Sequence, residues 1–326
     1  MKPFRFLRPA SLAEAVGLLA EAGPVSRAYA GGSDLLGELK EGLAPCDRVV
    51  SLATLPELTG VAPEGDGLRL GAMVTVADLV GEPLLKGPYA VLAQAAQGVA
   101  TPEIRNQGTL GGNLCQRPRC LHYRSALADC RKRGGTDCPA RESRFQAYLS
   151  VMGEPDCVAV HPSDLALPLL TLEAEVVLTG PAGERSLPVA DFFTGPENDV
   201  TRETALAPGE VLTAVRLPPA PAGWRGVHRK ERERTAGDFA VVGVAAGAVP
   251  ADGALHHVRL ALGGLGAAPA RSAAAEAVLE GQAPTPALAE RAADAALADA
   301  RPLAHNGYKL HLARALICRA VETLVP

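Results

Sequence analysis

Seven cysteines are the residues with the greatest chemical potential in this chain of 326 residues. Five of them fall within residues 115–160, and the last four of those are separated by nine, seven and eighteen residues: Cys120, Cys130, Cys138 and Cys157. Zinc ribbons and zinc fingers use close Cys-x-x-Cys pairs, which this segment lacks. Widely spaced thiolates in a long loop can instead surround an iron–sulfur cluster, which accepts ligands from several directions. Spacing alone leaves open a cluster, a zinc site and unliganded thiols.

Two glycine-rich segments could approach a bound ligand closely. The first, Gly31 to Asp34, is expected between a strand and a helix, where adjacent glycines and free N–H groups suit a pyrophosphate. The second spans 101–114 and has three glycines within five residues, which indicates a compact turn outside regular helix or strand. Each is also typical of an ordinary connecting turn. Neither has the Walker pattern, and Pro269 replaces the last glycine of a dinucleotide fingerprint in 264–269.

The remaining candidates have simpler interpretations. His161 precedes a proline in a turn and is expected to be structural. The basic run 228–238 is typical of a solvated face, and the isolated Cys46 and Cys318 are expected to be bystanders. A Ser-His-Asp signature and a close pair of carboxylates with a credible partner are both missing, so the sequence gives hydrolase chemistry no support.

The elements that must position these residues are expected to alternate at the start of the chain. A strand at 4–9, a helix after Ser11, a strand near 25–30 and a helix ending at Gly42 follow from the spacing of apolar residues. Further along, the sequence predicts a strand pair over 68–76, helices beginning at Thr75 and ending at Gly98, and a helix and strand over 163–180. The stretch 218–223 marks a domain boundary, followed by two strands and then helices from about residue 272.

Composition sets the broad class. The length corresponds to about two domains, with 48% hydrophobic and 21% charged residues, as in a folded globular protein. A net charge of −4 and only 4% aromatic residues argue against nucleic-acid binding. No segment is apolar enough to span a bilayer, and the amino terminus lacks the pattern of a signal peptide. We therefore expect a cytoplasmic protein, in which clustered cysteines hold a metal or do redox chemistry.

Four segments together resemble the FAD-binding medium subunit of the xanthine dehydrogenase/molybdenum hydroxylase family: AGGSDLL, IRNQGTLGGNL, PSDLALPLLTLEA and the stretch from Lys230 to Asp238. The resemblance extends to the carboxyl-terminal LGGLGAAPARSAAAEAVLEG and covers essentially the whole chain. It implies an α+β fold: a vanillyl-alcohol-oxidase type (PCMH-type) FAD-binding domain of two α/β subdomains, followed by a small sheet-plus-helices domain. The expected boundaries are 1–220, with subdomains of about 1–58 and 59–220, and 221–326, a domain like that of the CO dehydrogenase flavoprotein.

The resemblance also implies the residues that bind FAD. One pyrophosphate loop would consist of Ala30, Gly31, Gly32, Ser33, Asp34 and Leu35, with Ser33 where the family often has threonine. A second loop would consist of Gly108, Thr109, Gly112 and Asn113. Asp164 matches an acidic residue near the sugar end of the flavin, and Lys230 matches a lysine near the isoalloxazine ring.

The chain departs from most of the family between Asn113 and Asp164, where fifty residues stand in place of about ten. The additional residues are the cysteine-rich insertion, 115–160. Similar insertions in the flavin subunits of 4-hydroxybenzoyl-CoA reductase and bacterial aldehyde oxidoreductase hold an extra [4Fe-4S] iron–sulfur cluster. The resemblance thus implies that Cys120, Cys130, Cys138 and Cys157 are cluster ligands. Cys115 is left out because relatives without the insertion can also carry a cysteine there.

The function that the resemblance implies is electron transfer within a larger enzyme. Substrate would react at a molybdenum cofactor on a large subunit, and electrons would pass through iron–sulfur [2Fe-2S] centres of a small subunit to FAD on this chain. The flavin would pass them to NAD, a quinone, a ferredoxin or oxygen. Two alternatives remain: a zinc-stapled interaction subunit without redox activity, and a free-standing flavin oxidase.

Overall fold

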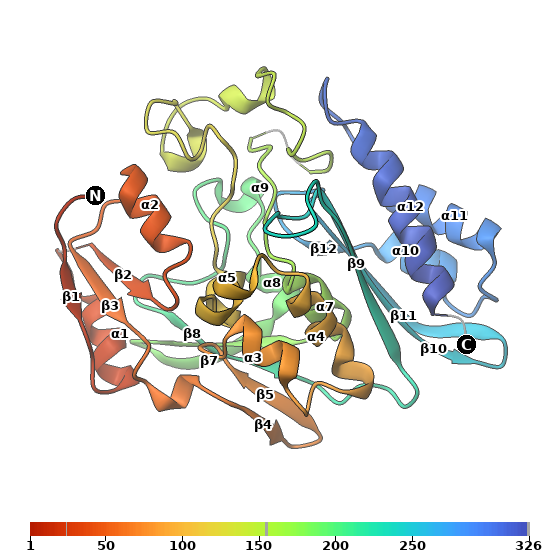
Figure 1. Ribbon diagram of the computed structural model, residues 1–326, viewed down its shortest axis with the longest axis horizontal. Coiled ribbons are helices and arrows are strands. Elements are labelled where there is room, and N and C mark those ends of the chain that lie inside the picture. Colours follow the sequence, from red (N-terminus) through yellow and green to blue (C-terminus); the bar gives the residue numbers. More distant parts are fainter. Residues whose placement is uncertain (24, 154–155, 325–326) are drawn as a thin grey trace.

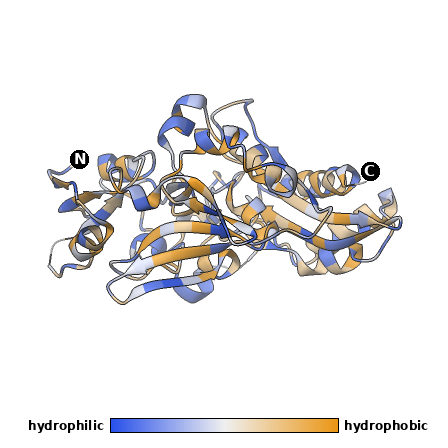
Figure 2. Ribbon diagram, turned by 90° about the horizontal axis from the view of Figure 1, so that it is seen from below, coloured by the Kyte–Doolittle hydropathy of each residue, from blue (hydrophilic) through white to orange (hydrophobic). Residues whose placement is uncertain are grey.

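The computed structural model describes residues 1–23, 25–153 and 156–324 of the chain. The described residues form three β-sheets, which follow one another along an elongated molecule from β1 to α12 (Figure 1). Figure 2 shows that hydrophobic residues run along the strands and that the helices alternate hydrophobic and hydrophilic faces. This pattern is expected where a sheet and its helices bury a shared core.

The first sheet is parallel and leads into the first glycine segment. Its strands pair in the order β1 (Arg5–Leu7), β3 (Arg48–Ser51) and β2 (Ser26–Tyr29). Helix α1 (Leu12–Ala20) begins after Ser11, whose hydroxyl accepts a hydrogen bond from the Glu14 N–H. After β2 the chain runs through the glycines into α2 (Leu35–Glu41). The expected order of strand, glycine turn and helix is confirmed.

The second sheet is antiparallel, in the order β4 (Val61–Glu64), β5 (Gly67–Gly71), β8 (Val211–Leu217), β6 (Glu175–Gly180) and β7 (Gly183–Pro188). The helices of this part are α3 (Val76–Gly81), α4 (Ala90–Gln97), α5 (Pro102–Gln107), α6 (Leu110–Leu114), α7 (Ala166–Thr171), α8 (Val189–Phe192) and α9 (Pro196–Asp199), with 3₁₀ turns η1 (Pro56–Leu58) and η2 (Gly87–Tyr89). Thr75 begins α3 through a reciprocal capping box with Asp78, so the predicted helix start is confirmed.

The third sheet is also antiparallel, in the order β12 (Ala270–Arg271), β11 (Ala254–Gly263), β10 (Val242–Ala251) and β9 (Arg225–Glu231). Helices α10 (Ala273–Leu279), α11 (Pro286–Ala296) and α12 (Tyr308–Thr323) follow. A Cβ atom at Gly243 or Gly263 would lie 2.8 or 3.0 Å from the Leu167 side chain of α7. Glycine at these positions lets the third sheet pack directly against α7. Because β9 pairs with β10, this packing also places β9 near α7.

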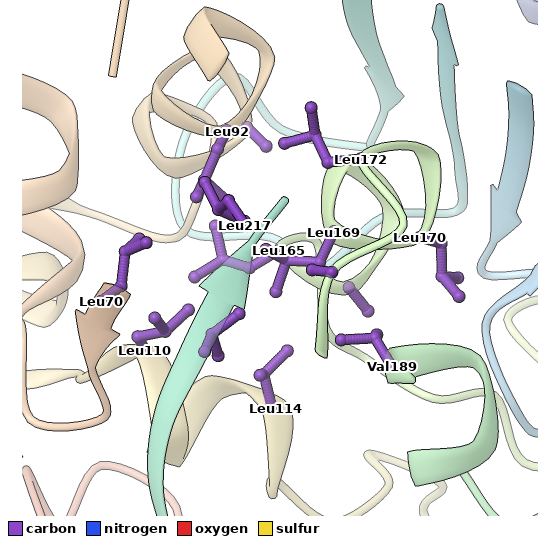
Figure 3. Packing of buried hydrophobic residues seen from close by; sticks show 14 of the residues in the cluster. Leu70, Leu92, Leu110, Leu114, Leu165, Leu169, Leu170, Leu172, Val189 and Leu217 are labelled. Atoms are coloured by element: carbon purple, nitrogen blue, oxygen red, sulfur yellow. The ribbon is translucent and has the colours of Figure 1, made fainter. Parts of the chain in front are cut away.

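Buried leucines fix the second glycine segment from below. Leu110 and Leu114 of α6 point toward Leu165, which precedes α7, and Leu169, which lies within α7 (Figure 3). All four side chains are fully buried. Burying each leucine contributes roughly 2 kcal/mol. Because α6 is only five residues long, this packing rather than helix propensity holds it in place.

The insertion has little regular structure, as expected. It contains two 3₁₀ turns, η3 (Arg131–Arg133) and η4 (Pro139–Arg141), and lies at the top of the view in Figure 1, between α2 and α12. Its hydrophobic core is small and consists of Ala140, Leu149 and Val158, with Cys120, Cys138 and Leu303 packed against it. Polar contacts must therefore supply much of what holds the segment to the rest of the protein.

Two sequence-based expectations were wrong in whole or in part. Residues 101–114 were expected to lack regular structure but form α5 and α6, separated at Gly108; both helices are too short to show a helical period, and glycine content hides the second. The basic run 228–238 was expected to be a solvated face; residues 233–237 are exposed as expected, but His228 and the Lys230 side chain, both on β9, are buried. Among the described residues no helix is long and apolar enough to cross a membrane.

Candidate functional site

The two glycine segments meet backbone to backbone. A Cβ atom at Gly31 would lie 1.6 Å from the carbonyl oxygen of Gln107, and one at Gly112 would lie 3.9 Å from the Cβ of Ala30. Thr109 holds the second segment in shape, because its hydroxyl accepts a hydrogen bond from the Gly112 N–H at 3.1 Å. The approach of the two backbones requires glycine at position 31.

A cavity of about 280 Å³ lies beside this contact. Seven of the twelve residues predicted to bind FAD line it: Ser33, Asp34, Gly108, Gly112, Asn113, Asp164 and Lys230. The other five are near these in the chain but do not line the cavity: Ala30, Gly31, Gly32, Leu35 and Thr109. Residues from four separate parts of the sequence are therefore brought to one site.

A buried ion pair in the lining of this cavity joins the segment before α7 to β9. Lys230 Nζ lies 2.6 Å from Asp164 Oδ2 and donates a second hydrogen bond to the Gly98 carbonyl oxygen at 3.1 Å. The two side chains are 6% and 5% exposed. Burial raises the pKa of the Asp164 carboxyl, and the charge of Lys230 opposes this increase. Each charge thus depends on the other for compensation.

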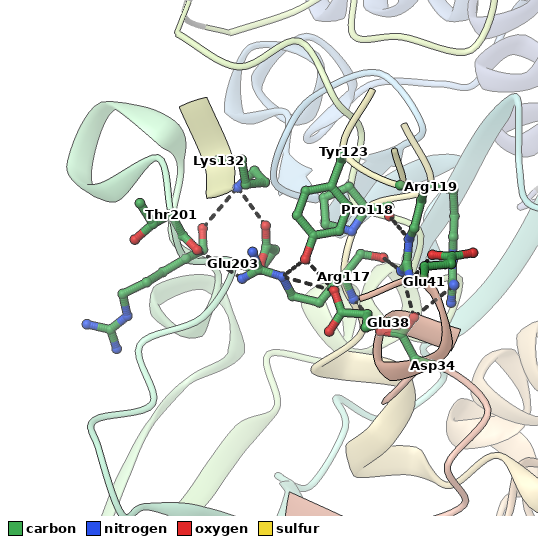
Figure 4. Close-up of polar contacts among 12 residues, drawn as sticks. Asp34, Glu38, Glu41, Arg117, Pro118, Arg119, Tyr123, Lys132, Thr201 and Glu203 are labelled. Atoms are coloured by element: carbon green, nitrogen blue, oxygen red, sulfur yellow. Dashed lines mark hydrogen bonds and ion pairs between the residues drawn. The ribbon is translucent and has the colours of Figure 1, made fainter. Parts of the chain in front are cut away.

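Arginines of the insertion bind the side chain of Asp34, the last residue of the first glycine turn. The Asp34 carboxylate pairs with Arg119 at 2.8 Å and with Arg124 at 2.7 Å, and accepts a hydrogen bond from the Arg117 N–H at 2.7 Å (Figure 4). Arg119 also lines the cavity, and its Nε is buried without a partner among the described residues. Its guanidinium lies over the ring of Phe239, 4.8 Å from the ring centroid, and Phe239 also lines the cavity.

A second set of buried charges anchors the base of the insertion. Glu203 forms ion pairs with Arg117 and, at 2.6 Å, with Lys132 (Figure 4). The Tyr123 hydroxyl donates a hydrogen bond to the Glu38 carboxylate of α2 and accepts one from Arg117 Nε at 2.8 Å. These contacts tie the insertion both to α2 and to the loop that follows α9.

Electrostatic interactions link the four predicted cluster ligands within the insertion. Burial raises the pKa of the Cys157 thiol to about 11, and Cys138 and Cys120 add to the increase. Burial likewise raises the pKa of Cys120, with further contributions from Cys130 and Cys138. In the part of the chain that the structure describes, however, no three His, Cys, Asp or Glu side chains are arranged to hold a metal ion. The thiols thus interact electrostatically, but the described residues contain no preformed coordination site.

The other candidates from the sequence lie apart from the cavity lining. Cys318 packs against the core of the third part, and the Cys46 thiol donates to the Arg48 carbonyl oxygen. His161 is buried edge to face against Phe193, and burial lowers its pKa to about 3, so it is a structural residue as expected. Cys115 is partly buried against the largest core.

Sequence reasoning missed four residues of the site. Arg117, Arg119 and Arg124 contact the first glycine turn, and Phe239 lines the cavity beside Arg119. The available signal was the density of arginine at the start of the insertion. The sequence does not show which residue these arginines contact, because Asp34 lies more than eighty residues away from them in the chain.

The site fits a dinucleotide such as FAD. Gly108 and Gly112 line the cavity without side chains, so a ligand's phosphates can approach main-chain atoms there. Lys230 and Arg119 supply positive charge at different points along the cavity. The lining offers no paired general acid and base with a nucleophile, so the arrangement suits holding a cofactor better than hydrolysis.

Two family models together match nearly the whole chain. Residues 2–220 match the FAD binding domain in molybdopterin dehydrogenase, and residues 228–324 match the CO dehydrogenase flavoprotein C-terminal domain. These matches confirm the expected α+β fold class.

Individual proteins with similar sequences agree with this result. The chain is 37% identical to the aldehyde oxidoreductase FAD-binding subunit PaoB of Escherichia coli (strain K12) over 96% of both chains. It is 29% identical to the carbon monoxide dehydrogenase medium chain of Hydrogenophaga pseudoflava, covering 98% of this chain and 96% of that one.

The fold agrees as well. A solved structure of carbon monoxide dehydrogenase from Hydrogenophaga pseudoflava, which lacks the Mo-pyranopterin moiety of its cofactor, matches with a TM-score of 0.78 and 30% identity, over 99% of this chain and 98% of that chain. The protein is thus an oxidoreductase component, and it belongs to the family of FAD-binding medium subunits of the xanthine dehydrogenase and carbon monoxide dehydrogenase type.

Proposed function

We propose that this chain is an electron-transfer subunit that holds FAD in the cavity between its two glycine segments and Lys230. The observation that carries the proposal is the convergence of these three parts of the chain on one cavity. Bound there, FAD would supply the chemistry of accepting and releasing electrons. The chain's own part is to bind and orient it.

The residues have separate tasks in this proposal. Ala30 to Leu35 and the segment from Gly108 to Asn113 hold the pyrophosphate, because Gly108 and Gly112 line the cavity without side chains that would exclude it. Asn113 is fixed by the Ser163 hydroxyl, which donates to its Oδ1 at 2.6 Å. Lys230, held by Asp164, places a positive charge at the flavin end.

Partner subunits are part of the proposal. The relatives are named as medium chains or FAD-binding subunits, which supports an assembly with other chains. We infer that a large subunit with a molybdenum cofactor and a small subunit with [2Fe-2S] iron–sulfur centres deliver electrons to this chain. The external acceptor would be NAD, a quinone, a ferredoxin or oxygen, and the cytoplasm remains the predicted location.

We further propose that Cys120, Cys130, Cys138 and Cys157 hold an extra [4Fe-4S] iron–sulfur cluster. Their mutual electrostatic interactions support this, since all four thiols gather in one part of the insertion. The small core of the segment also supports it, because such a loop needs a further source of stability. Thiolate ligation would provide that stability only once the metal is bound.

Flavin content tests the main proposal. The double variant Lys230→Met/Asp164→Asn removes both buried charges together and should fold, whereas a single substitution would leave one charge unpaired. We expect the wild-type chain to release FAD on denaturation and the double variant to bind it at least ten-fold more weakly. Lys40→Met, an exposed lysine on α2, serves as the control. Wild-type protein that stays without flavin after reconstitution would disprove the proposal.

Metal analysis tests the cluster. We expect about four iron and four sulfide per chain, and a loss of most iron in Cys138→Ser. Cys318→Ser should keep its iron, because that thiol lies on α12. Stoichiometric zinc in place of iron would contradict the cluster and favour the zinc-stapled alternative.

A further inference from the structure

A second cavity, of about 410 Å³, lies next to the proposed flavin cavity. The two share part of their lining: Arg119, Pro162, Asp238 and Phe239. On its other side the second cavity is lined by Cys120 and by residues 144–149 of the insertion. It therefore lies between the flavin site and the cysteine cluster.

The wall of this cavity is unusually rich in aromatic and apolar side chains for such an aromatic-poor chain. Leu121, Phe145, Tyr148 and Phe239 all line it, and their exposed fractions lie between 43% and 61%. Exposed apolar groups that gather around a concave surface mark binding sites more often than scattered ones do. Three rings around one cavity favour a flat ring as the occupant.

Polar groups at the rim show what the ring should carry. Arg144 lies over the Phe145 ring, 5.0 Å from its centroid, and Arg119 lies over Phe239. Both guanidinium groups can donate hydrogen bonds to ligand oxygens. Glu233 and Asp238 also line the cavity, and Glu233 accepts a hydrogen bond from the Tyr148 hydroxyl. Charges of both signs at the rim favour an occupant that is neutral overall.

The same lining disfavours a second dinucleotide such as NAD. It contains no glycine, so its backbone nowhere offers the close approach that the flavin cavity offers to a pyrophosphate. A neutral ring with carbonyl oxygens satisfies the aromatic walls and the arginine donors together. Quinones are such rings, and they accept electrons.

We propose that this second cavity is the binding site for a quinone that oxidises the flavin. The inference rests on the proposed function, since it takes the neighbouring cavity to hold FAD. Oxidation of the reduced flavin releases two electrons and two protons, and the quinone takes up both to become a hydroquinone. The shared wall of Arg119 and Phe239 is the boundary across which the electrons pass.

Direct binding to the full-length, oxidised, flavin-loaded chain tests the site without turnover. The probe is 2,3-dimethyl-1,4-naphthoquinone, whose substituted ring carbons prevent addition of the Cys120 thiol. Isothermal titration calorimetry should show one saturable site. The double variant Phe145→Ala/Tyr148→Ala should raise the dissociation constant about ten-fold, since stacking on each of the two rings contributes roughly two- to twelve-fold. Both side chains are half exposed, so the variant should fold.

Leu127→Ala is the matched control, because Leu127 belongs to the same insertion, is 99% exposed and does not line the cavity. It should bind the quinone like the wild type. The inference would be overturned if the flavin-loaded wild type showed no saturable quinone binding, or if the double variant bound the quinone as tightly as the wild type. Either result would leave the FAD proposal intact. NAD binding that weakens in the same double variant would also overturn it. Failure of the FAD proposal would appear separately, as protein without flavin before any titration.

Discussion

Replacing Asp34 by asparagine tests how strongly the insertion and the flavin loop depend on each other. In the wild type one carboxylate receives Arg119, Arg124 and the Arg117 N–H, at 2.7 to 2.8 Å. Asparagine keeps the shape of the aspartate side chain and one acceptor oxygen, but it removes the negative charge. Its NH₂ group, a donor, then faces one of the three donor groups of the arginines and cannot accept a hydrogen bond from it. Two guanidinium groups then lose their compensating charge.

The expected cost follows from these contacts. A hydrogen bond to a charged group contributes about 1.5–3 kcal/mol. The single side-chain oxygen of asparagine can accept only some of the three hydrogen bonds that the Asp34 carboxylate accepts. The side chains of Asp34 and Arg124 are 16% and 12% exposed, whereas Arg119 is 31% exposed and is screened by water. We expect the free energy of unfolding to fall by about 2–3 kcal/mol and the melting temperature by roughly 5 °C. FAD should also dissociate more readily, because the disturbed turn lines its cavity.

Differential scanning fluorimetry and the ratio of flavin to protein absorbance measure the two effects. Glu41→Gln is the control on the same helix, since Glu41 lies 3.8 Å from Arg124 and is half exposed. It should lower stability by no more than about 0.5 kcal/mol. If Asp34→Asn has the same melting temperature as the Glu41→Gln control and retains its flavin, the insertion does not support the flavin loop in the way that these contacts indicate.

Three further predictions concern other buried positions. Gly31→Ala should abolish flavin binding in an absorbance titration, because its Cβ would collide with the Gln107 carbonyl oxygen, whereas Gly17→Ala, in open space on α1, should be neutral or stabilising by about 0.5–1 kcal/mol. Glu203→Gln should lower stability in urea by about 3 kcal/mol, since Arg117 and Lys132 lose a buried charge; an unchanged midpoint would contradict this. Burial lowers the pKa of Lys309 to about 7, so between about pH 7 and 10 the unfolded chain binds more protons and the free energy of unfolding should rise with pH, by at most about 1.4 kcal/mol per unit. Urea titrations at pH 7.5 and 9 should show a smaller rise in Lys309→Met, and an equal rise would refute the assignment.

Local signals in the sequence were enough to predict most of the elements. Ser11 and Thr75 are helix caps whose side chains make the expected hydrogen bonds, and glycine at 42 and 98 ends the helices that precede it. Such signals act within a few residues, so they can be read without the fold. They fail for α5 and α6, which are only six and five residues long, and α6 is held by Leu110 and Leu114 against α7 rather than by its own propensity.

The candidate site was accessible only in part. The glycine segments carried a local signal, but their contact at Gly31 and Gln107 depends on how two distant turns pack. The Lys230 position followed from the family resemblance alone, because a lysine in a basic run is ordinarily a solvated residue. Its burial becomes understandable once β9 lies beside α4 and brings Lys230 Nζ to the Gly98 carbonyl oxygen. Pairing between Asp164 and a strand that begins more than sixty residues later is a property of the packed structure.

The insertion is connected to both ends of the molecule, and this distinguishes it from a removable surface loop. Its arginines hold Asp34 at the first glycine turn. At its other end, Lys309 and Asn306, at the start of α12, donate hydrogen bonds to the carbonyl oxygens of Leu149 and Ser150. A change in the middle of the segment, such as ordering of its four thiols around a metal, would therefore act on the flavin loop and on the third sheet through fixed contacts. Binding of metal and retention of flavin should then be coupled, and thermodynamic linkage requires that each increases the affinity for the other equally.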